Sequence, residues 1–302
     1  MYLHCSEGSL HNELRKINAK IVKPESDIFS SVHWTSIRPE RSRRLLDFRE
    51  IWAYRELLVT LAIRDIKVRY KQTMLGAAWA IIQPLTTMVI FTVIFGRLAQ
   101  IPSEGFPYPI FVYSALLPWI FFANAISMSG NSLVGSTQLV SKVYFPRLIV
   151  PFSSIGAGLV DFLISSVILL LLMLFYGVNW TGHLLAAPFL MAGVILCALG
   201  VGSVLSALTV SYRDFRFVIP FMVQIWMFLT PVVYGVGFIP ENYRWLLMLN
   251  PMSGYIDGFR AAFLGRPFDW IGVGISVTFS LVLFAIGTAF FQKVERRFAD
   301  VI

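Results

Sequence analysis

The sequence predicts an all-α integral membrane protein with six transmembrane helices, an N-terminal amphipathic interfacial helix, and short re-entrant helices before the last span. The first observation behind this prediction is composition. Of the 302 residues, 57% are hydrophobic and only 14% are charged, whereas soluble domains carry about 25% charged residues. The second observation is a series of nearly uncharged runs of about 20 residues, which as helices cross roughly 30 Å of hydrocarbon. Because lipid offers the backbone no hydrogen-bond partners, helices are expected rather than open sheets.

The first segment, residues 1–50, is expected to be a cytosolic tail. It contains nine Lys or Arg and seven Asp or Glu residues without a clear period, which is typical of partly disordered chain. A small docking segment for a partner is the alternative. The segment has no apolar run of the kind found in signal peptides, so none is predicted.

Residues 51–76 are predicted to form an amphipathic helix at the membrane surface. Ile63, Ile66, Tyr70 and Met74 are spaced so that they share one helical face. Basic side chains occupy the other sides, where they would lie near lipid phosphates. Gly76 then allows the chain to turn from the membrane plane into the first span.

The six-helix transmembrane domain is expected over residues 77–291, followed by a cytosolic C-terminal tail over 292–302. The expected spans are Ala77–Phe95, Tyr108–Met128, Leu148–Tyr176, Leu184–Val210, Val218–Val236 and Ile271–Phe291. Pro84, Pro118 and Pro231 are expected to bend or end helices.

The distribution of basic residues predicts the orientation. Lys and Arg outnumber the acids in four segments: before the first span, between spans two and three, between spans four and five (Arg213 and Arg216), and after span six. These positions share one side of a six-span protein, so both termini are predicted to be cytoplasmic. The formal net charge of +8 is thus explained by contact with anionic lipid rather than with nucleic acid.

The loop before the last span is too apolar for a solvated loop. Pro251 interrupts it, which favours two short helices dipping into the outer leaflet. A helix lying flat on the interface is the alternative.

The sequence contains none of the motifs that would indicate an enzyme of a common class. It has no G-x-x-x-x-G-K-[ST] loop, no H-E-x-x-H and no G-x-S-x-G, and three of its four histidines lie in the N-terminal tail. Cys5 and Cys197 are far apart and predict neither a disulfide framework nor a metal site. No catalytic residue and no metal ligand is therefore predicted.

Asp161 is the only acidic residue well inside an expected span. A charge at that depth is costly, so it indicates either an ion or proton site or a carboxylate paired between helices. We favour the second interpretation, with an arginine such as Arg147 or Arg213 as the partner.

Aromatic side chains are common in the second and fifth expected spans. Such rings either face lipid or line a conduit whose apolar faces let sugar rings slide past. The candidate channel aromatics are Trp119, Phe122, Trp226, Phe228 and Tyr234.

Five segments, in order along the chain, resemble the permease subunits of ABC-type polysaccharide exporters, which move O-antigen, teichoic acid or capsule chains. They are "RDIKVRYKQTMLGAAWAIIQPL" (64–85), "SKVYFPRLIVP" (141–151), "YRDFRFVIPFMVQIWMFLTPVVY" (212–234), "LNPM" (249–252) and the ending "ERRFADVI". Each segment alone is weak evidence, but five in the family's order are specific.

The resemblance implies a half-transporter in the cytoplasmic (inner) membrane. A homodimer of this chain would form the channel, and two copies of a separate ABC ATPase would bind ATP and magnesium and drive transport. The expected substrate is an undecaprenyl-linked polysaccharide, O-antigen before other polymers. The alternatives are export of teichoic acid, capsule, or a small lipid or drug, an ion-coupled carrier built on Asp161, and, ranked last, a membrane enzyme of glycolipid assembly.

The resemblance also implies roles for two groups of residues. The gate-helix candidates, which would contact the substrate headgroup or the ATPase, are Arg64, Lys67, Arg69, Tyr70 and Lys71; plain anchoring to lipid is the alternative. The candidates for coupling to the ATPase are Lys142, Tyr144, Phe145, Pro146 and Arg147. Tyr144, Phe145 and Pro146 are expected to form an exposed apolar patch, with insertion into the inner leaflet as the alternative.

Overall fold

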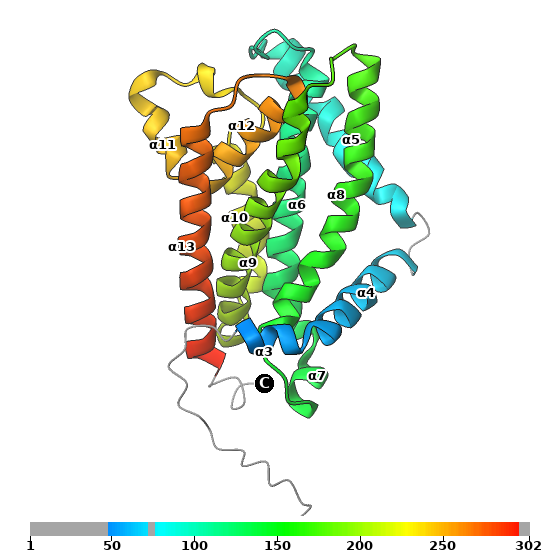
Figure 1. Ribbon diagram of the computed structural model, residues 1–302, viewed down its shortest axis with the longest axis vertical. Helices are drawn as coiled ribbons and strands as arrows, with labels where there is room; N and C mark the ends of the chain where they lie inside the picture. Colours follow the sequence, from blue (N-terminus) through cyan, green and yellow to red (C-terminus); the bar gives the residue numbers. More distant parts are fainter. Residues whose placement is uncertain (1–47, 72–75, 296–302) are drawn as a thin grey trace, which may run out of the picture. The chain divides into compact units, whose positions relative to one another are not determined.

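The computed structural model describes residues 48–71 and 76–295, all of which belong to one compact unit, 44–302. Every regular element in this described part is a helix (Figure 1). Residues 1–47 of the tail expected over 1–50, the position of Met74, and residues 296–302 of the expected C-terminal tail lie outside the described residues.

Five helical segments in the described part are long and apolar enough to cross a membrane. They are α5 (Trp79–Phe91) continued by the π-helix η2 (Thr92–Leu98), α6 (Tyr108–Gly135), α8 (Ile149–Phe175), η3 (Gly182–Ala186) with α9 (Ala187–Ser211), and α13 (Trp270–Glu295). These match five of the six expected spans to within seven residues at each end.

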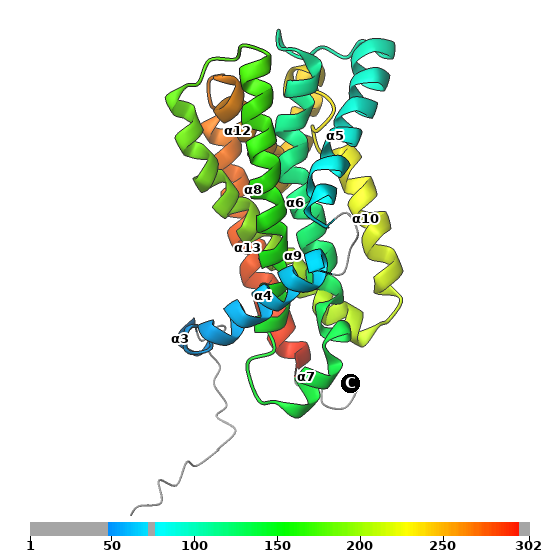
Figure 2. The same cartoon turned by 90° about the vertical axis from the view of Figure 1, so that its right-hand side faces the viewer.

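The remaining expected span is shorter than the sequence indicated. Helix α10 (Phe215–Leu229) has 15 residues, or about 22 Å at 1.5 Å per residue, and ends seven residues before the expected Val236. It ends there because Thr230 is extended, the conformation that a residue preceding a proline favours. Figures 1 and 2 show that α3 and the C-terminal end of α13 nevertheless lie at the same end of the bundle.

Helix α6 is the centre of the bundle. Most of its residues are buried, and it packs against α8, α9 and α12. In contrast, most apolar side chains of α5 and α10 are at least partly exposed, and some, including Val89 and Phe221, are more than half exposed. Such surfaces suit contact with lipid or with another chain, because neither is a solvated environment.

Helices α9 and α13 approach each other closely where both carry glycine. An added Cβ on Gly200 would lie 2.6 Å from the backbone nitrogen of Phe284, and one on Gly287 would collide with the carbonyl oxygen of Gly200. Small residues permit this backbone contact, a common arrangement between membrane helices.

The loop before the last span contains two short helices, α11 (Arg244–Met248) and α12 (Pro251–Leu264). Of the two interpretations given above, the one with two short helices agrees with this count. Helix α12 begins at Pro251, with Asn250 accepting a hydrogen bond from the Met252 N–H at 3.0 Å. Almost all of α12 is buried against α6, α9 and α13. Its depth in the membrane stays a prediction.

The expected interfacial helix is divided into α3 (Phe48–Ala53) and α4 (Arg55–Lys71). Figure 1 shows α4 running obliquely to the bundle, where it packs mainly against α8. Leu61 is buried in this contact, whereas Ile63 is 45% exposed. The helix therefore has apolar side chains both toward the protein and away from it, and its packed face is not centred on Ile63.

A second, smaller hydrophobic cluster lies at the α3–α7 end of the bundle. It contains residues of α4, α6, α8, α9 and α13, together with residues of the short helix α7 (Thr137–Lys142) and of the segment that follows α7. Leu61, Phe145 and Phe291 belong to it, so the oblique helix and the loop after α7 share one apolar core.

Candidate functional site

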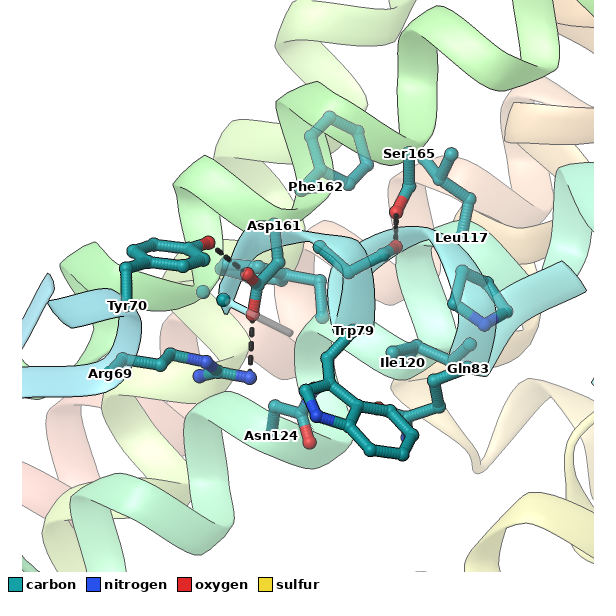
Figure 3. Close-up of a pocket in the computed structure, with 15 residues that line it drawn as sticks. Arg69, Tyr70, Trp79, Gln83, Leu117, Ile120, Asn124, Asp161, Phe162 and Ser165 are labelled. Carbon is teal, nitrogen blue, oxygen red and sulfur yellow. Dashed lines mark hydrogen bonds and ion pairs between the residues drawn. The ribbon is translucent and has the colours of Figure 1, made fainter. Parts of the chain in front are cut away.

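Three side chains link the oblique helix α4 to the long helix α8. Arg69 Nη2 lies 2.6 Å from Asp161 Oδ2, and the Tyr70 hydroxyl donates a hydrogen bond to Asp161 Oδ1. Figure 3 shows both groups converging on the carboxylate from α4. The Asp161 side chain is 12% exposed and the Arg69 side chain 30%, so the pair is largely withdrawn from water.

The structure confirms that Asp161 pairs with an arginine, but the two partners named from the sequence are wrong. Arg147 precedes α8 and lies about 21 Å from Asp161 along the helix axis, at 1.5 Å per residue. Its guanidinium instead donates to the carbonyl oxygen of Glu295 at 2.9 Å. The true partner, Arg69, comes from a helix 92 residues earlier in the chain, which residue spacing alone does not reveal.

A cavity of about 230 Å³ lies beside this pair, between α4, α5, α6 and α8. Its lining combines the Arg69–Asp161 pair with apolar rings and uncharged polar groups, among them Trp79, Gln83 and Asn124 (Figure 3). Ser165, also in the lining, donates to the carbonyl oxygen of Ala80 at 2.9 Å and so holds the start of α5 against α8.

The five gate-helix candidates divide into two groups. Arg69 and Tyr70 point toward α8, and burial together with the hydrogen bond to Asp161 raises the pKa of Tyr70 well above its ordinary value. Lys67 and Lys71 are exposed, and Arg64 Nη2 pairs with its neighbour Asp65 at 2.8 Å. The structure therefore brings only two of the five to the cavity.

The coupling candidates also divide. Tyr144 is 88% exposed, but Phe145 is only 5% exposed and lies in the second hydrophobic cluster. The expectation that Phe145 is exposed was wrong, because it packs in a cluster with residues distant in sequence, among them Leu61 of α4 and Phe291 of α13. Lys142 is exposed and Pro146 is half-buried.

Arg147 fixes the same segment to the end of α13. Its backbone N–H donates to Glu295 Oε1 at 3.2 Å, in addition to the guanidinium contact with the Glu295 carbonyl. Phe145 and Arg147 thus anchor the loop, and the outward surface of this segment is formed by Lys142, Val143 and Tyr144.

The channel-aromatic candidates occupy different environments. Trp119 and Phe122 are 2% and 0% exposed, so in this conformation they present no ring to a channel. Trp226 donates its indole N–H to Asn250 Oδ1 at 2.9 Å, which ties the end of α10 to the start of α12. Tyr234 donates to the carbonyl oxygen of Phe228 at 3.3 Å, and Phe228 is the most exposed of the five, at 56%.

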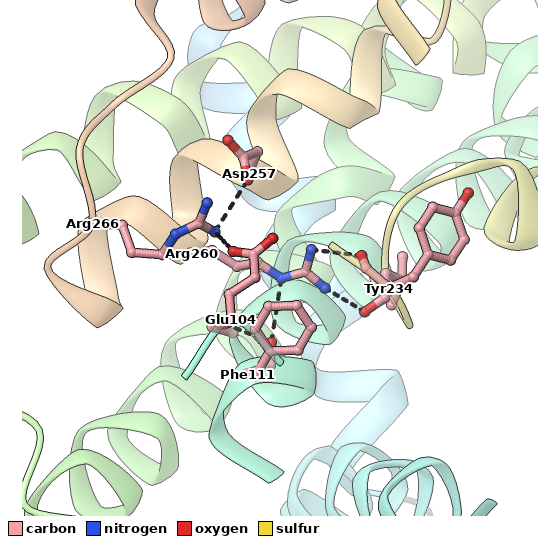
Figure 4. A network of polar contacts seen from close by, with 8 residues as sticks. Glu104, Phe111, Tyr234, Asp257, Arg260 and Arg266 are labelled. Carbon is pink, nitrogen blue, oxygen red and sulfur yellow. Dashed lines mark hydrogen bonds and ion pairs between the residues drawn. The ribbon is translucent and has the colours of Figure 1, made fainter. Parts of the chain in front are cut away.

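A buried arginine at the opposite end of the bundle was missed by the sequence reasoning, which placed it among loop charges. Arg260 is wholly buried; its guanidinium donates to the carbonyl oxygens of Val232 at 2.7 Å and Tyr234 at 2.9 Å, and its Cζ lies 3.9 Å from the centre of the Phe111 ring. Figure 4 shows how it holds the turn after α10 against α6. Arg260 lies four residues after Ile256 and three before Phe263, so on a helix it shares their apolar face. This spacing is the one sequence signal that could have indicated its burial.

An ion-pair network lies beside Arg260. Arg266 Nη1 is 2.6 Å from Glu104 Oε2 and 3.4 Å from Asp257 Oδ1 (Figure 4). Glu104 has a left-handed backbone with φ of 54° and abuts Gly235. The network thereby joins the loop before α6 to the turn after α10 and to the segment after α12.

Among the residues that the structure describes, no group of three or more His, Cys, Asp or Glu side chains is arranged to hold a metal ion. The acidic side chains at the two sites described above, Asp161 and the pair Glu104 and Asp257, are each matched by an arginine.

Comparison with known proteins gives consistent results. The family model described as "ABC-2 type transporter" matches residues 56–264. The chain is 28% identical to an O-antigen export system permease protein of Klebsiella pneumoniae over 82% of this chain and 95% of that protein. It is also 28% identical to an O-antigen export system permease protein of Myxococcus xanthus, covering 84% and 98%, and 23% identical to a polysialic acid transport protein of Escherichia coli, covering 78% and 92%.

Proposed function

The chain belongs to the ABC-2 type transporter family, and we propose that it is the membrane-spanning half of an ATP-driven exporter of lipid-linked polysaccharide, with O-antigen as the first candidate. The observation that carries this proposal is the similarity to two O-antigen export permeases over nearly their whole length. The chain is a multi-pass membrane protein with a transport role rather than an enzymatic one. Capsule polysaccharide is the second candidate, on the similarity to the polysialic acid transport protein.

We assign ATP hydrolysis to a separate ABC ATPase, because the ABC-2 transporter family implies such a partner. We place its docking surface at Lys142, Val143 and Tyr144. An exposed tyrosine and valine next to a lysine form the kind of mixed patch that marks a protein contact. The loop that carries them is held by Phe145 and Arg147, so a force applied to Tyr144 would be passed to the second hydrophobic cluster.

The proposed complex contains two copies of this chain and two of the ATPase, with both termini of this chain in the cytoplasm. The orientation rests on the Lys and Arg residues at the α3–α7 end of the bundle. The proposed homodimer is supported by the exposed apolar faces of α5 and α10. Phe228 is the channel aromatic that this arrangement favours, because it alone among the five candidates is more than half exposed.

The first test is purification of the full chain from its own cells in a mild detergent, followed by mass spectrometry of what accompanies it. A P-loop ATPase present in equal amount supports the proposal. A preparation that moves substrate under an ion gradient without any ATPase would contradict it and favour the carrier alternative.

The docking surface predicts that Tyr144→Ala and Phe145→Ala have different effects. Tyr144→Ala should reduce recovery of the ATPase at least several-fold, because a large exposed contact is lost, while the midpoint of thermal unfolding stays within about 2 °C. Phe145→Ala should destabilise the chain itself by about 3 kcal/mol, because it leaves a cavity in the second cluster.

Both variants can be measured in one pull-down and one thermal unfolding series. Val167→Ala, at an exposed position on α8, serves as the control for loss of a surface side chain. Full recovery of the ATPase with Tyr144→Ala would show that the docking surface lies elsewhere.

A further inference from the structure

We propose that Glu104 is a releasable latch: with Arg266 it holds residues 235–249, here called the outer flap, against the bundle, and this contact has to open during export. The flap lies at the end of the bundle opposite α3 and α7. It contains the helices η4 (Val236–Phe238), η5 (Glu241–Tyr243) and α11 (Arg244–Met248). The need to open rests on the proposed export function, whereas the closing contact is a property of this chain alone.

Both ends of the outer flap are fixed to the bundle. Just before the flap begins, the buried Arg260 donates to the carbonyl oxygen of Tyr234 at 2.9 Å. Just after it ends, Asn250 donates to Thr230 Oγ1 at 2.8 Å and accepts from the Trp226 indole N–H at 2.9 Å. A segment that is fixed at both ends and loosely packed between them can move as a hinged lid.

Between its ends the outer flap is loosely packed. Leu247 is the buried residue of α11, and η4 and η5 contain none. Trp245 and Leu249 are 57% and 56% exposed, and Figure 1 shows α11 at the edge of the bundle. A segment with so few buried contacts opens at a much smaller cost than the core does.

Glu104 is positioned to hold the outer flap closed. Its Oε2 atom lies 2.6 Å from Arg266 Nη1 (Figure 4). Its Oε1 atom lies so close to Gly235, the first residue of the flap, that a Cβ atom added there would collide with it. One carboxylate thus connects the loop before α6, the start of the flap and the segment after α12.

The loop that carries Glu104 has a strained backbone. Gln100 has a φ of 52° and Glu104 a φ of 54°, in the left-handed region that is costly for residues with a side chain. Such strain persists only where other contacts maintain it, and it is typical of segments that switch. Release of Glu104 from Arg266 would let the loop relax, so the strain favours opening and the ion pair opposes it.

The ion pair is weak enough to be released. The side chains of Glu104 and Arg266 are 23% and 24% exposed, so water can replace the contact, and pairs that water can reach contribute little to stability. Arg266 also has a second acidic partner, Asp257, at 3.4 Å, so release leaves no unpaired cation. Arg260 is wholly buried, which suits it to be the permanent anchor beside the latch.

The first test is a reversible cross-link between Glu104→Cys and Gly235→Cys. Glu104 Cγ, whose place a cysteine Sγ would take, lies 3.4 Å from the position of a Cβ at residue 235, which is within reach of a disulfide. The variant also carries Cys5→Ser, and its other cysteine, Cys197, is buried. Surface polysaccharide is measured in cells that have no other copy of this chain, after oxidation and again after reduction.

Oxidation of the double-cysteine variant should lower export at least about tenfold, and reduction should restore it to within about twofold of Glu104→Cys alone, because only the closed flap is held by the disulfide. Equal export before and after reduction would overturn the proposal, since the flap would not need to open. Failure of the two cysteines to cross-link would show that Glu104 does not contact Gly235. If the unchanged chain exports no polysaccharide, the proposed function fails, and the latch is then judged on the purified chain.

The second test measures opening of the outer flap in the purified full chain in detergent. Leu247→Cys serves as the reporter, and its rate of reaction with a water-soluble maleimide is followed by mass spectrometry. Glu104→Gln should raise this rate about fivefold, because it removes the latch charge while keeping the size of the side chain. Glu241→Gln is the matched control within the flap: Glu241 pairs with Arg244 and its side chain is 85% exposed, so the rate should stay within about twofold.

The buried Cys197 distinguishes a latch from a general loss of packing. With Glu104→Gln its reaction with maleimide should stay as slow as in the unchanged chain, and the midpoint of thermal unfolding should stay within about 2 °C. An unchanged rate at residue 247, an equal rise with Glu241→Gln, or a parallel rise at Cys197 would each contradict a local latch. None of these results depends on an ATPase, so failure of the latch leaves the proposed export function standing.

Discussion

Replacing Gly287 by alanine is expected to disrupt the packing of α9 and α13 and to lower the free energy of unfolding by about 3 kcal/mol. The added methyl group would collide with the backbone carbonyl of Gly200. A flexible side chain can move aside at little cost, but a helix backbone moves only if the whole contact opens. The measurement is the thermal unfolding midpoint of the detergent-purified protein, together with its yield as a single species by gel filtration.

Gly274→Ala on the same helix is the matched control. An added Cβ there meets nothing within 4 Å, so the substitution should be neutral or slightly stabilising, because alanine is the better helix former. If the two variants unfolded at the same temperature, the close approach of the two helices would not contribute to stability.

The second large effect is expected for Arg260→Met. Methionine fills much of the volume but leaves the carbonyl oxygens of Val232 and Tyr234 without their buried donor. An unsatisfied buried carbonyl costs about 1–3 kcal/mol, so the loss should reach about 3–5 kcal/mol. The turn after α10 should also become accessible to protease, and limited proteolysis followed by mass spectrometry would locate the cut.

Arg244→Gln tests whether any arginine in this region has the same importance. Arg244 pairs with Glu241, whose side chain is 85% exposed, and exposed pairs contribute about 0–1 kcal/mol. Its replacement should leave the unfolding midpoint nearly unchanged. Equal destabilisation by both variants would contradict the distinction between a buried anchor and a surface pair.

The long spans were predictable because a run of apolar residues long enough to cross lipid has few alternative structures. The fifth span was extended to Val236 because apolar residues continue after Pro231, although this proline was itself expected to bend or end a helix, and α10 does end just before it. Hydropathy measures transfer into lipid and contains no information about backbone conformation.

The side-chain partners were less predictable than the helices. Phe145 was expected to be exposed because it lies in a loop between two spans, and Arg260 because it lies among loop charges, yet both are buried by segments distant in sequence. Asp161 could be identified as a paired carboxylate from the cost of a charge in lipid. Its partner Arg69 depends on the angle at which α4 crosses α8, which no local pattern determines.

The unequal burial of α5 and α6 implies that the bundle resists opening unequally. In the most apolar window of α6, 78% of residues are buried, against 11% in the segment from α5 through η2. The work of detaching a helix grows with the contact area that it gives up. Helix α6 therefore resists displacement from the bundle more strongly than the α5 segment does. The α5 segment has few buried residues and ends in a π-helix, so it should move with less work than α6.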